Sequence, residues 1–205
     1  MRQSLVVLLL IVLETHANAA EWTLKSDADG IRVLSRDESD SAVVSFRGEG
    51  TVDQPLASLY EILSKPELYH LWMPMFKDSK ILEDRSRWHK IVSIHIGMPW
   101  PVKDRAFINE GLVVDGPDGS MVLSIRSISY PYQDESKVLG WTQRSQFLIR
   151  PGKTPSETWV EVELNQDPRG DIPKWMVNWV QASWPRKFFE NLRRYSRNPG
   201  TKVND

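Results

Sequence analysis

The strongest constraint on the fold is a long series of short segments with strand-like character, most of them followed by turn residues and all of them preceding one long helical segment. Strands are predicted at 31–36, 42–52, 79–83, 88–97, 106–114, 120–129, 142–150 and 158–165. In the last of these, Val160, Val162 and Leu164 alternate with Glu161 and Glu163. Such alternation is typical of a sheet with one face in water, so the chain should form a long antiparallel sheet.

Helical segments are predicted at three places. Pro55 opens one that continues through Ser64, a second short one follows Pro66, and a third runs from about Ile172 to Tyr195. Two strands, two short helices, about six more strands and a long terminal helix indicate an α+β fold, in which a curved antiparallel sheet wraps around the terminal helix.

The terminal helix carries two apolar stripes on nearly opposite faces. The first contains Ile172, Trp175, Met176, Trp179 and Ser183, and the second contains Trp184, Phe188, Leu192 and Tyr195. Pro185 lies where the stripes change, and a proline inside a helix removes one hydrogen bond and clashes with the preceding turn. We therefore predict a kink or break near 181–185, two helical pieces, and a first stripe that faces an internal cavity.

Residues 1–19 have the pattern of an export signal. Arg2 precedes an unbroken apolar run from Leu5 to Leu13, and Ala17-Asn18-Ala19 is a typical cleavage site. The run is too short to span a bilayer, which takes about 20 residues. We expect cleavage after Ala19 and a periplasmic or secreted protein; an uncleaved anchor and a buried first element are the alternatives.

Composition and motifs argue against several functional classes. The chain has no cysteine, which excludes disulfides, thiolate nucleophiles and cysteine metal sites. Its 26 basic and 27 acidic residues create no overall field that would attract nucleic acid. Common catalytic motifs are absent from the sequence, and His89 and His95, about 20 Å apart on one strand, are too distant to share a metal. We expect no catalytic residue, no metal and no cofactor.

Two segments resemble the steroidogenic-acute-regulatory-protein-related lipid-transfer (START) domain family. Pro99-Trp100-Pro101, followed by Arg105 and Phe107, is similar to the family's proline-aromatic-proline loop before an Arg-Asp-aromatic strand. The segment 167–173, Asp-Pro-Arg-Gly-Asp-Ile-Pro, is similar to the one that opens the family's C-terminal helix. The resemblance covers about Trp22 to Arg194. One departure is Ala106, where the family usually has aspartate, which puts the ion pairing next to Arg105 in doubt.

The resemblance implies a helix-grip fold around an apolar tunnel for one lipid or sterol-like ligand, with the 97–105 loop and the C-terminal helix over its mouth. The candidate ligand-binding residues are Trp72, Trp100, Arg105, Arg126, Trp175, Met176 and Trp179. Aromatic side chains give wide, rigid apolar walls, and for Trp100, Trp175 and Trp179 ordinary core packing is the alternative. Arg105 either binds an anionic headgroup or is a structural partner of Asp104 or Asp78, and Arg126 is either an interior polar anchor or solvent-facing.

The leading hypothesis is a monomeric, exported, non-enzymatic protein that binds or transfers a phospholipid, fatty acyl or sterol-like ligand. An enzyme of cyclase or aromatase type from the same superfamily, and an interaction module for an apolar segment of a partner, are the alternatives. Residues 20–195 should form the domain and 196–205 a disordered tail. The basic residues near the chain's end either complement the helix dipole or give transient contact with an anionic membrane surface.

Overall fold

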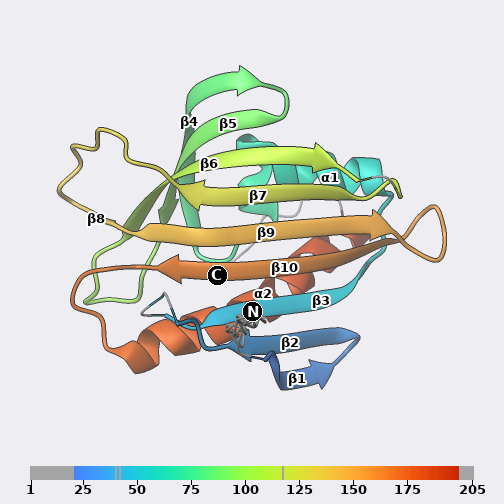
Figure 1. Ribbon diagram of the computed structural model, residues 1–205, viewed down its shortest axis with the longest axis horizontal. Helices are drawn as coiled ribbons and strands as arrows, with labels where there is room; N and C mark the ends of the chain where they lie inside the picture. Colours follow the sequence, from blue (N-terminus) through green and yellow to red (C-terminus); the bar gives the residue numbers. More distant parts are fainter. Residues whose placement is uncertain (1–20, 40, 42, 117, 199–205) are drawn as a thin grey trace, which may run out of the picture.

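A computed structural model describes residues 21–39, 41, 43–116 and 118–198, which form one ten-stranded sheet and three helical segments (Figure 1). The strands are β1 (Thr23–Ala28), β2 (Ile31–Arg36), β3 (Ser45–Val52), β4 (Phe76–Ser86), β5 (His89–Ile96), β6 (Arg105–Asp115), β7 (Met121–Ser127), β8 (Val138–Leu139), β9 (Trp141–Pro151) and β10 (Thr158–Asp167). The helices are α1 (Leu56–Ser64), the 3-10 helix η1 (Pro66–Leu71) and α2 (Lys174–Arg197). The predicted export signal and residues 199–205 lie outside the described residues, and α2 includes the first two residues of the predicted tail.

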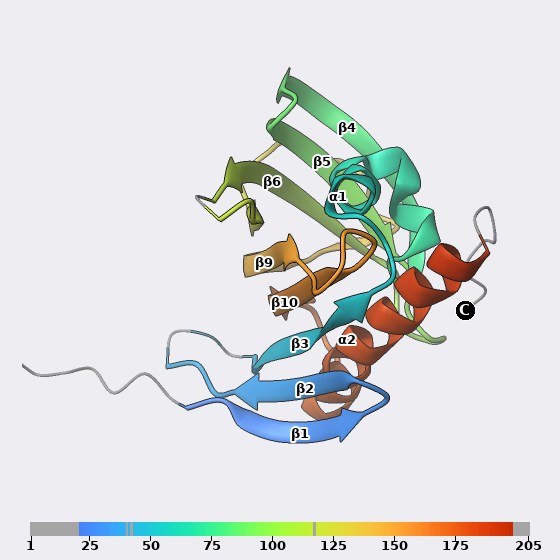
Figure 2. The ribbon, with the colours of Figure 1, turned by 90° about the vertical axis from the view of Figure 1, so that its right-hand side faces the viewer.

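The strands lie in the order β1-β2-β3-β10-β9-β7-β6-β5-β4, with antiparallel pairing throughout this path, and β8 pairs in parallel with β6. The order joins the first three strands to the last long strand, β10, and thereby brings the two ends of the domain together. The sheet is strongly curved, and α1 and α2 lie on its concave side (Figure 2). The predicted helix-grip arrangement, a curved antiparallel sheet around a long terminal helix, is therefore confirmed.

Two glycines of β3 allow α2 to lie directly on the sheet. A Cβ atom at Gly48 would be 2.7 Å from Pro185 Cβ, and one at Gly50 would be 2.9 Å from the main-chain oxygen of Gly30 and 3.2 Å from the Phe189 ring. Distances this short would push the helix away, because a packed core has no space for an added methyl group. The missing side chains fix where the middle of α2 crosses the sheet.

The prediction of a broken terminal helix is wrong. α2 is one helix of 24 residues that contains Pro185. Its buried side is a single stripe, formed by Val177, Val180, Trp184, Phe188 and Leu192. Spacings of three and four residues keep this stripe on one face from end to end. Because Trp175 and Trp179 are not part of it, no reversal of the buried face occurs at Pro185, and its buried ring packs against the sheet instead.

The apolar core lies between the concave sheet face and the helices, and Trp72 is at its centre. Four aromatic rings surround Trp72 at centroid distances of 5.1–6.5 Å: Tyr69, Phe147, Trp184 and Phe188. Its indole nitrogen donates to the carbonyl oxygen of Ile62 at 3.0 Å, so the polar atom of this fully buried side chain is satisfied. None of the helices in the described part of the chain is long and apolar enough to cross a membrane.

Candidate binding cavity

A cavity of about 100 Å³ lies under the first half of α2. It is bordered by the concave faces of β5, β6, β7, β9 and β10, by η1, by the end of α1 and by α2. Its apolar lining consists of Leu63, Trp72, Met73, Met75, Ile94, Ile96, Met98, Phe107, Ile125, Phe147, Leu164, Pro168, Val177, Val180 and Trp184. A wall of this composition provides a dry environment for an apolar molecule and few groups for chemistry.

The polar side chains in the lining are few: Arg105, Asn109, Ser145 and Gln166, with the phenol of Tyr69. Burial raises the pKa of Tyr69, so the phenol stays neutral. Among the described residues no carboxylate lines the cavity, and no group of three or more metal-binding side chains is present in the described part of the chain. The lining therefore resembles a binding site for an apolar ligand more than a site of acid–base catalysis.

Arg105 lines the cavity, but its guanidinium bonds to main-chain carbonyl groups. Nε donates to the oxygen of Pro168 at 3.0 Å, Nη2 donates to that of Arg169 at 2.9 Å, and Nη1 donates to that of Lys103. Burial of this side chain lowers its pKa, and nearby Asp104 opposes that shift. The arginine thus ties the loop before β6 to the segment after β10, with carbonyls in place of the partners that the sequence suggested.

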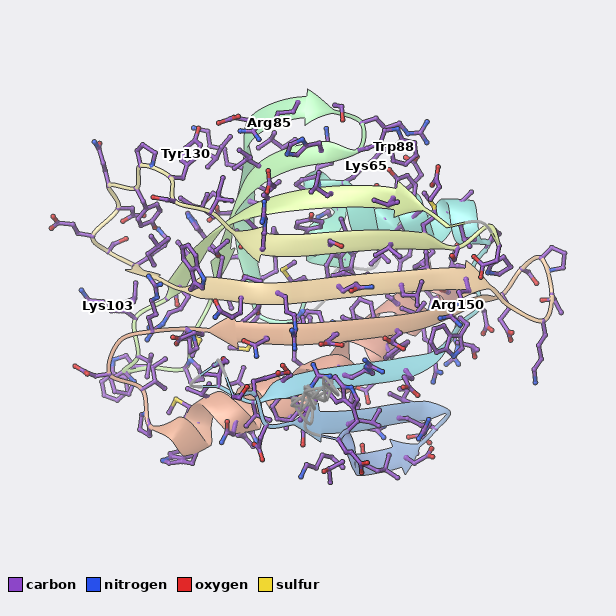
Figure 3. The ribbon with its side chains drawn as sticks, viewed as in Figure 1. Lys65, Arg85, Trp88, Lys103, Tyr130 and Arg150 are labelled. Atoms are coloured by element: carbon purple, nitrogen blue, oxygen red, sulfur yellow. The ribbon has the colours of Figure 1, made fainter. Side chains whose placement is uncertain are left out.

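Two segments border the cavity at one side of the molecule: the loop 97–104 and the first turns of α2. Met98 and Arg105 at the ends of this loop line the cavity, as do Val177 and Val180 of α2. Lys103 marks the loop in Figure 3, on the same side of the view as the beginning of α2. We call the part of the cavity between these segments its mouth.

The tryptophans of these segments point outward. Trp100 is 92% exposed, Trp175 68% and Trp179 60%. The prediction that Trp175, Met176 and Trp179 form an inward stripe is therefore wrong: the cavity is lined by Val177 and Val180, on the other side of α2. The physical reason is that both faces of this part of α2 are apolar, and the concave sheet accommodates the one with the smaller side chains. Met176 is partly buried and is not part of the lining.

Trp72 and Arg126 complete the predicted set. Trp72 forms part of both the core and the cavity wall. Arg126 extends from the opposite face of β7, where its side chain is 66% exposed and bonds to Glu110 at 2.8 and 3.0 Å. His89 lies 2.9 Å from the other oxygen of this carboxylate. Arg126 is thus solvent-facing, and its hydrogen bonds, with those of His89, lower the pKa of Glu110.

Replacing Arg126 with alanine should leave the affinity for an apolar ligand unchanged, because Arg126 is on the outer sheet face. The free energy of unfolding should change by at most about 1 kcal/mol, since the Arg126–Glu110 ion pair is partly exposed. The lowered pKa of Glu110 stabilises the folded state at pH values above the ordinary Glu pKa of about 4.3. This stabilisation is lost as the pH falls through the lowered pKa of the folded state. Without Arg126 the pKa rises, so acid unfolding should begin at a slightly higher pH, as circular dichroism would show. A loss of ligand affinity would contradict this assignment.

Comparisons with known proteins agree with this architecture. The START domain model matches residues 6–202. The chain is 22% identical over 181 residues to an uncharacterized protein of Pseudomonas aeruginosa, covering 87% of this chain and 88% of the relative. It is 21% identical over 185 residues to the human phosphatidylcholine transfer protein, covering 87% of this chain and 85% of that protein.

Solved structures show the same fold. The STAR-related lipid transfer protein of Xanthomonas axonopodis superimposes with a TM-score of 0.76 at 24% identity, covering 86% of this chain and 99% of that one. Human StAR-related lipid transfer protein 5 gives a TM-score of 0.80 at 18% identity, with 88% of each chain covered. START domains are generally lipid-transfer binders and not enzymes. With a family match that spans nearly the whole sequence, this chain belongs to the START domain family.

Proposed function

We propose that this protein is an exported carrier that binds one lipid molecule in the cavity under α2 and transfers it between membranes. The observation that carries the proposal is the cavity itself, a mostly apolar space whose wall combines the concave sheet with α2. Burial of apolar surface contributes about 25 cal/mol per Å², so a long-chain ligand can bind there without a covalent step.

Ligand uptake requires the cavity to expand. A volume of about 100 Å³ is below the roughly 300–1,000 Å³ that is usual for sites of small-molecule ligands. The mouth is the part of the wall best suited to move, because one of its sides is an irregular loop and the other is the end of a helix. We propose that the loop 97–104 and the first turns of α2 separate when a lipid enters or leaves.

Membrane contact would place the mouth at the lipid surface. Trp100, Trp175 and Trp179 are exposed on the two segments that border the mouth. Tryptophan favours the interfacial region of a bilayer, where its ring is in an apolar environment and its N–H group can still bond to water. Transient insertion of these side chains would bring the cavity to the acyl chains of the membrane and favour opening of the mouth there.

The proposal can be tested with protein purified from its own host under native conditions. Native mass spectrometry should show the protein with one bound lipid, and extraction with organic solvent should remove that added mass. The extracted protein should then bind an apolar fluorescent probe. Sequencing of the N-terminus tests export, because cleavage after Ala19 leaves Ala20 as the first residue. Absence of any bound lipid, together with absence of probe binding, would overturn the proposed function.

A further inference from the structure

A row of buried polar side chains crosses the otherwise apolar concave face. The Ser127 hydroxyl donates to Asn109 Oδ1 at 2.9 Å and accepts from the Thr142 amide nitrogen at 2.8 Å. Gln166 Nε2 lies 3.4 Å from the Thr142 hydroxyl. The row therefore runs from β6 through β7 and β9 to β10, and Asn109 and Gln166 bring it to the cavity wall.

Ser145, also on β9, differs from the members of this row. It lines the cavity and is only 3% exposed, yet its hydroxyl has no hydrogen-bond partner among the described residues. Buried hydroxyl groups are nearly always paired, because an unpaired one loses its bond to water without replacement. A hydroxyl in this position is suited to bond to a polar group of a ligand in the cavity. Asn109 accepts the bond from Ser127 through its amide oxygen, so its amide nitrogen offers a second donor on the same wall.

The charge of the lining restricts the polar group that can be bound. Arg105 is the only charged side chain among the described lining residues, and its three donating nitrogens are bonded to the carbonyl groups of Lys103, Pro168 and Arg169. These bonds use three of the five N–H groups of the guanidinium, so an anionic headgroup would find only part of the bonding capacity of Arg105 left for it. An uncharged headgroup needs no counter-charge when it is buried. An ammonium headgroup would meet no carboxylate on this wall.

From these contacts we infer that the cavity selects an uncharged lipid with a hydroxyl group, which hydrogen-bonds to Ser145 and Asn109 while its hydrocarbon part fills the apolar remainder. Long-chain alcohols, sterol-like alcohols and acylglycerols share this chemistry. The inference rests on the proposed function, since it concerns the ligand of the same cavity. It distinguishes this chain from a carrier that encloses a phosphate group.

The test is a cycle of two ligands and two proteins. Displacement of an apolar fluorescent probe is measured with 1-dodecanol and with 1-chlorododecane, which is similar in size but lacks the hydroxyl group, for the wild type and for Ser145→Ala. The comparison between proteins cancels the difference in solvation between the ligands. We expect Ser145→Ala to weaken binding of the alcohol by about three- to tenfold relative to the chloride, as for one hydrogen bond between neutral groups. Ser124→Ala, on the exposed outer face of β7, is the matched control and should leave the ratio unchanged.

The outcomes separate the two proposals. A probe that binds and is displaced, but with a ratio unaffected by Ser145→Ala, would overturn the hydroxyl inference and leave the lipid carrier intact. Stronger displacement by phosphatidylcholine or phosphatidylglycerol than by uncharged hydroxyl lipids of equal chain length would also overturn it. Failure of every apolar probe to bind would overturn the carrier itself.

Thermal unfolding of the ligand-free protein shows whether Ser145 has a structural role instead. Removing an unpaired buried hydroxyl should stabilise the empty protein, so we expect the Ser145→Ala melting temperature to rise by about 2–4 °C. A lower melting temperature for Ser145→Ala would mean that the hydroxyl stabilises the fold and is not reserved for a ligand. That result, too, would overturn the inference.

Discussion

Replacing Trp100, Trp175 and Trp179 together with alanine will reduce binding to lipid vesicles by at least about 100-fold and leave the fold intact. Burial of a whole tryptophan removes about 150–250 Å² from water, and at about 25 cal/mol per Å² even half of this contributes roughly 2–3 kcal/mol per residue. Part of the sum is lost to ordering at the membrane, but about 2.7 kcal/mol already corresponds to a factor of 100. The three side chains are exposed, so their removal should change stability by less than about 0.5 kcal/mol each.

Co-sedimentation with phosphatidylcholine vesicles measures the loss, and the transfer rate of a labelled lipid between two vesicle populations should fall with it. Trp159→Ala is the matched control, since this tryptophan lies on the outer face of β10 beside Arg150. It should bind vesicles as the wild type does. Unchanged vesicle binding by the triple variant would exclude the mouth as the membrane-contacting surface.

The basic residues near the end of α2 are a second possible membrane surface, and the structure gives several of them internal partners. Arg193 donates to the carbonyl oxygens of Thr51, Asp29 and Gly30, and Arg186 bonds to the Asp29 carboxylate. These contacts hold the end of the helix against the β1–β2 turn. Vesicle binding through the tryptophans should accordingly persist at 0.5 M salt, whereas binding through arginines would weaken strongly, because salt screens exposed charges.

The sheet was predictable because its strands carry their own pattern. In β10, Val160, Val162 and Leu164 are buried, whereas Glu161 and Glu163 are on the solvated face, as the alternation predicts. β1 was missed because it is an edge strand with almost wholly exposed side chains and therefore no buried face to produce a pattern. The two-residue strand β8 is too short to have a pattern.

The cavity was harder to predict, since its wall depends on contacts between distant segments. Helix periodicity shows that α2 has apolar residues on two faces, but only the shape of the sheet decides that Val177 faces inward and Trp175 outward. Ser145 had a usable signal: it has the same strand parity as Phe147 and Ile149, both buried. The sequence carries no signal for the bonding partners of Arg105, because these partners are main-chain carbonyl groups, which every residue has.

Removing the Arg105 side chain will lower the free energy of unfolding by about 2–4 kcal/mol and weaken all ligands to a similar extent. The loss follows from three hydrogen bonds with a charged donor, each worth about 1.5–3 kcal/mol, less the free energy that desolvation of the guanidinium costs. Without these bonds, the loop 97–104 and the segment 168–170 are no longer held together, so a bound ligand should also dissociate faster. Urea unfolding and stopped-flow release of an apolar probe measure the two effects.

Comparison of Arg105→Ala with Arg105→Lys separates this tether from recognition of an anionic headgroup. Lysine keeps the positive charge, but its compact ammonium group cannot reproduce the planar fork that reaches three carbonyls. If Arg105 only ties the loop 97–104 to the segment 168–170, both variants should lose stability. Both should also release neutral and anionic ligands faster, and to the same extent. An anion site predicts instead that Arg105→Lys retains a preference for anionic lipids that Arg105→Ala loses.

Arg144→Ala, which removes a half-exposed pairing with Glu38 on the outer face, is the control and should cost less than about 1 kcal/mol. If lysine preserved anionic selectivity, Arg105 would have to reach the ligand, and the carbonyl groups of Pro168 and Arg169 would be only its partners in the absence of lipid.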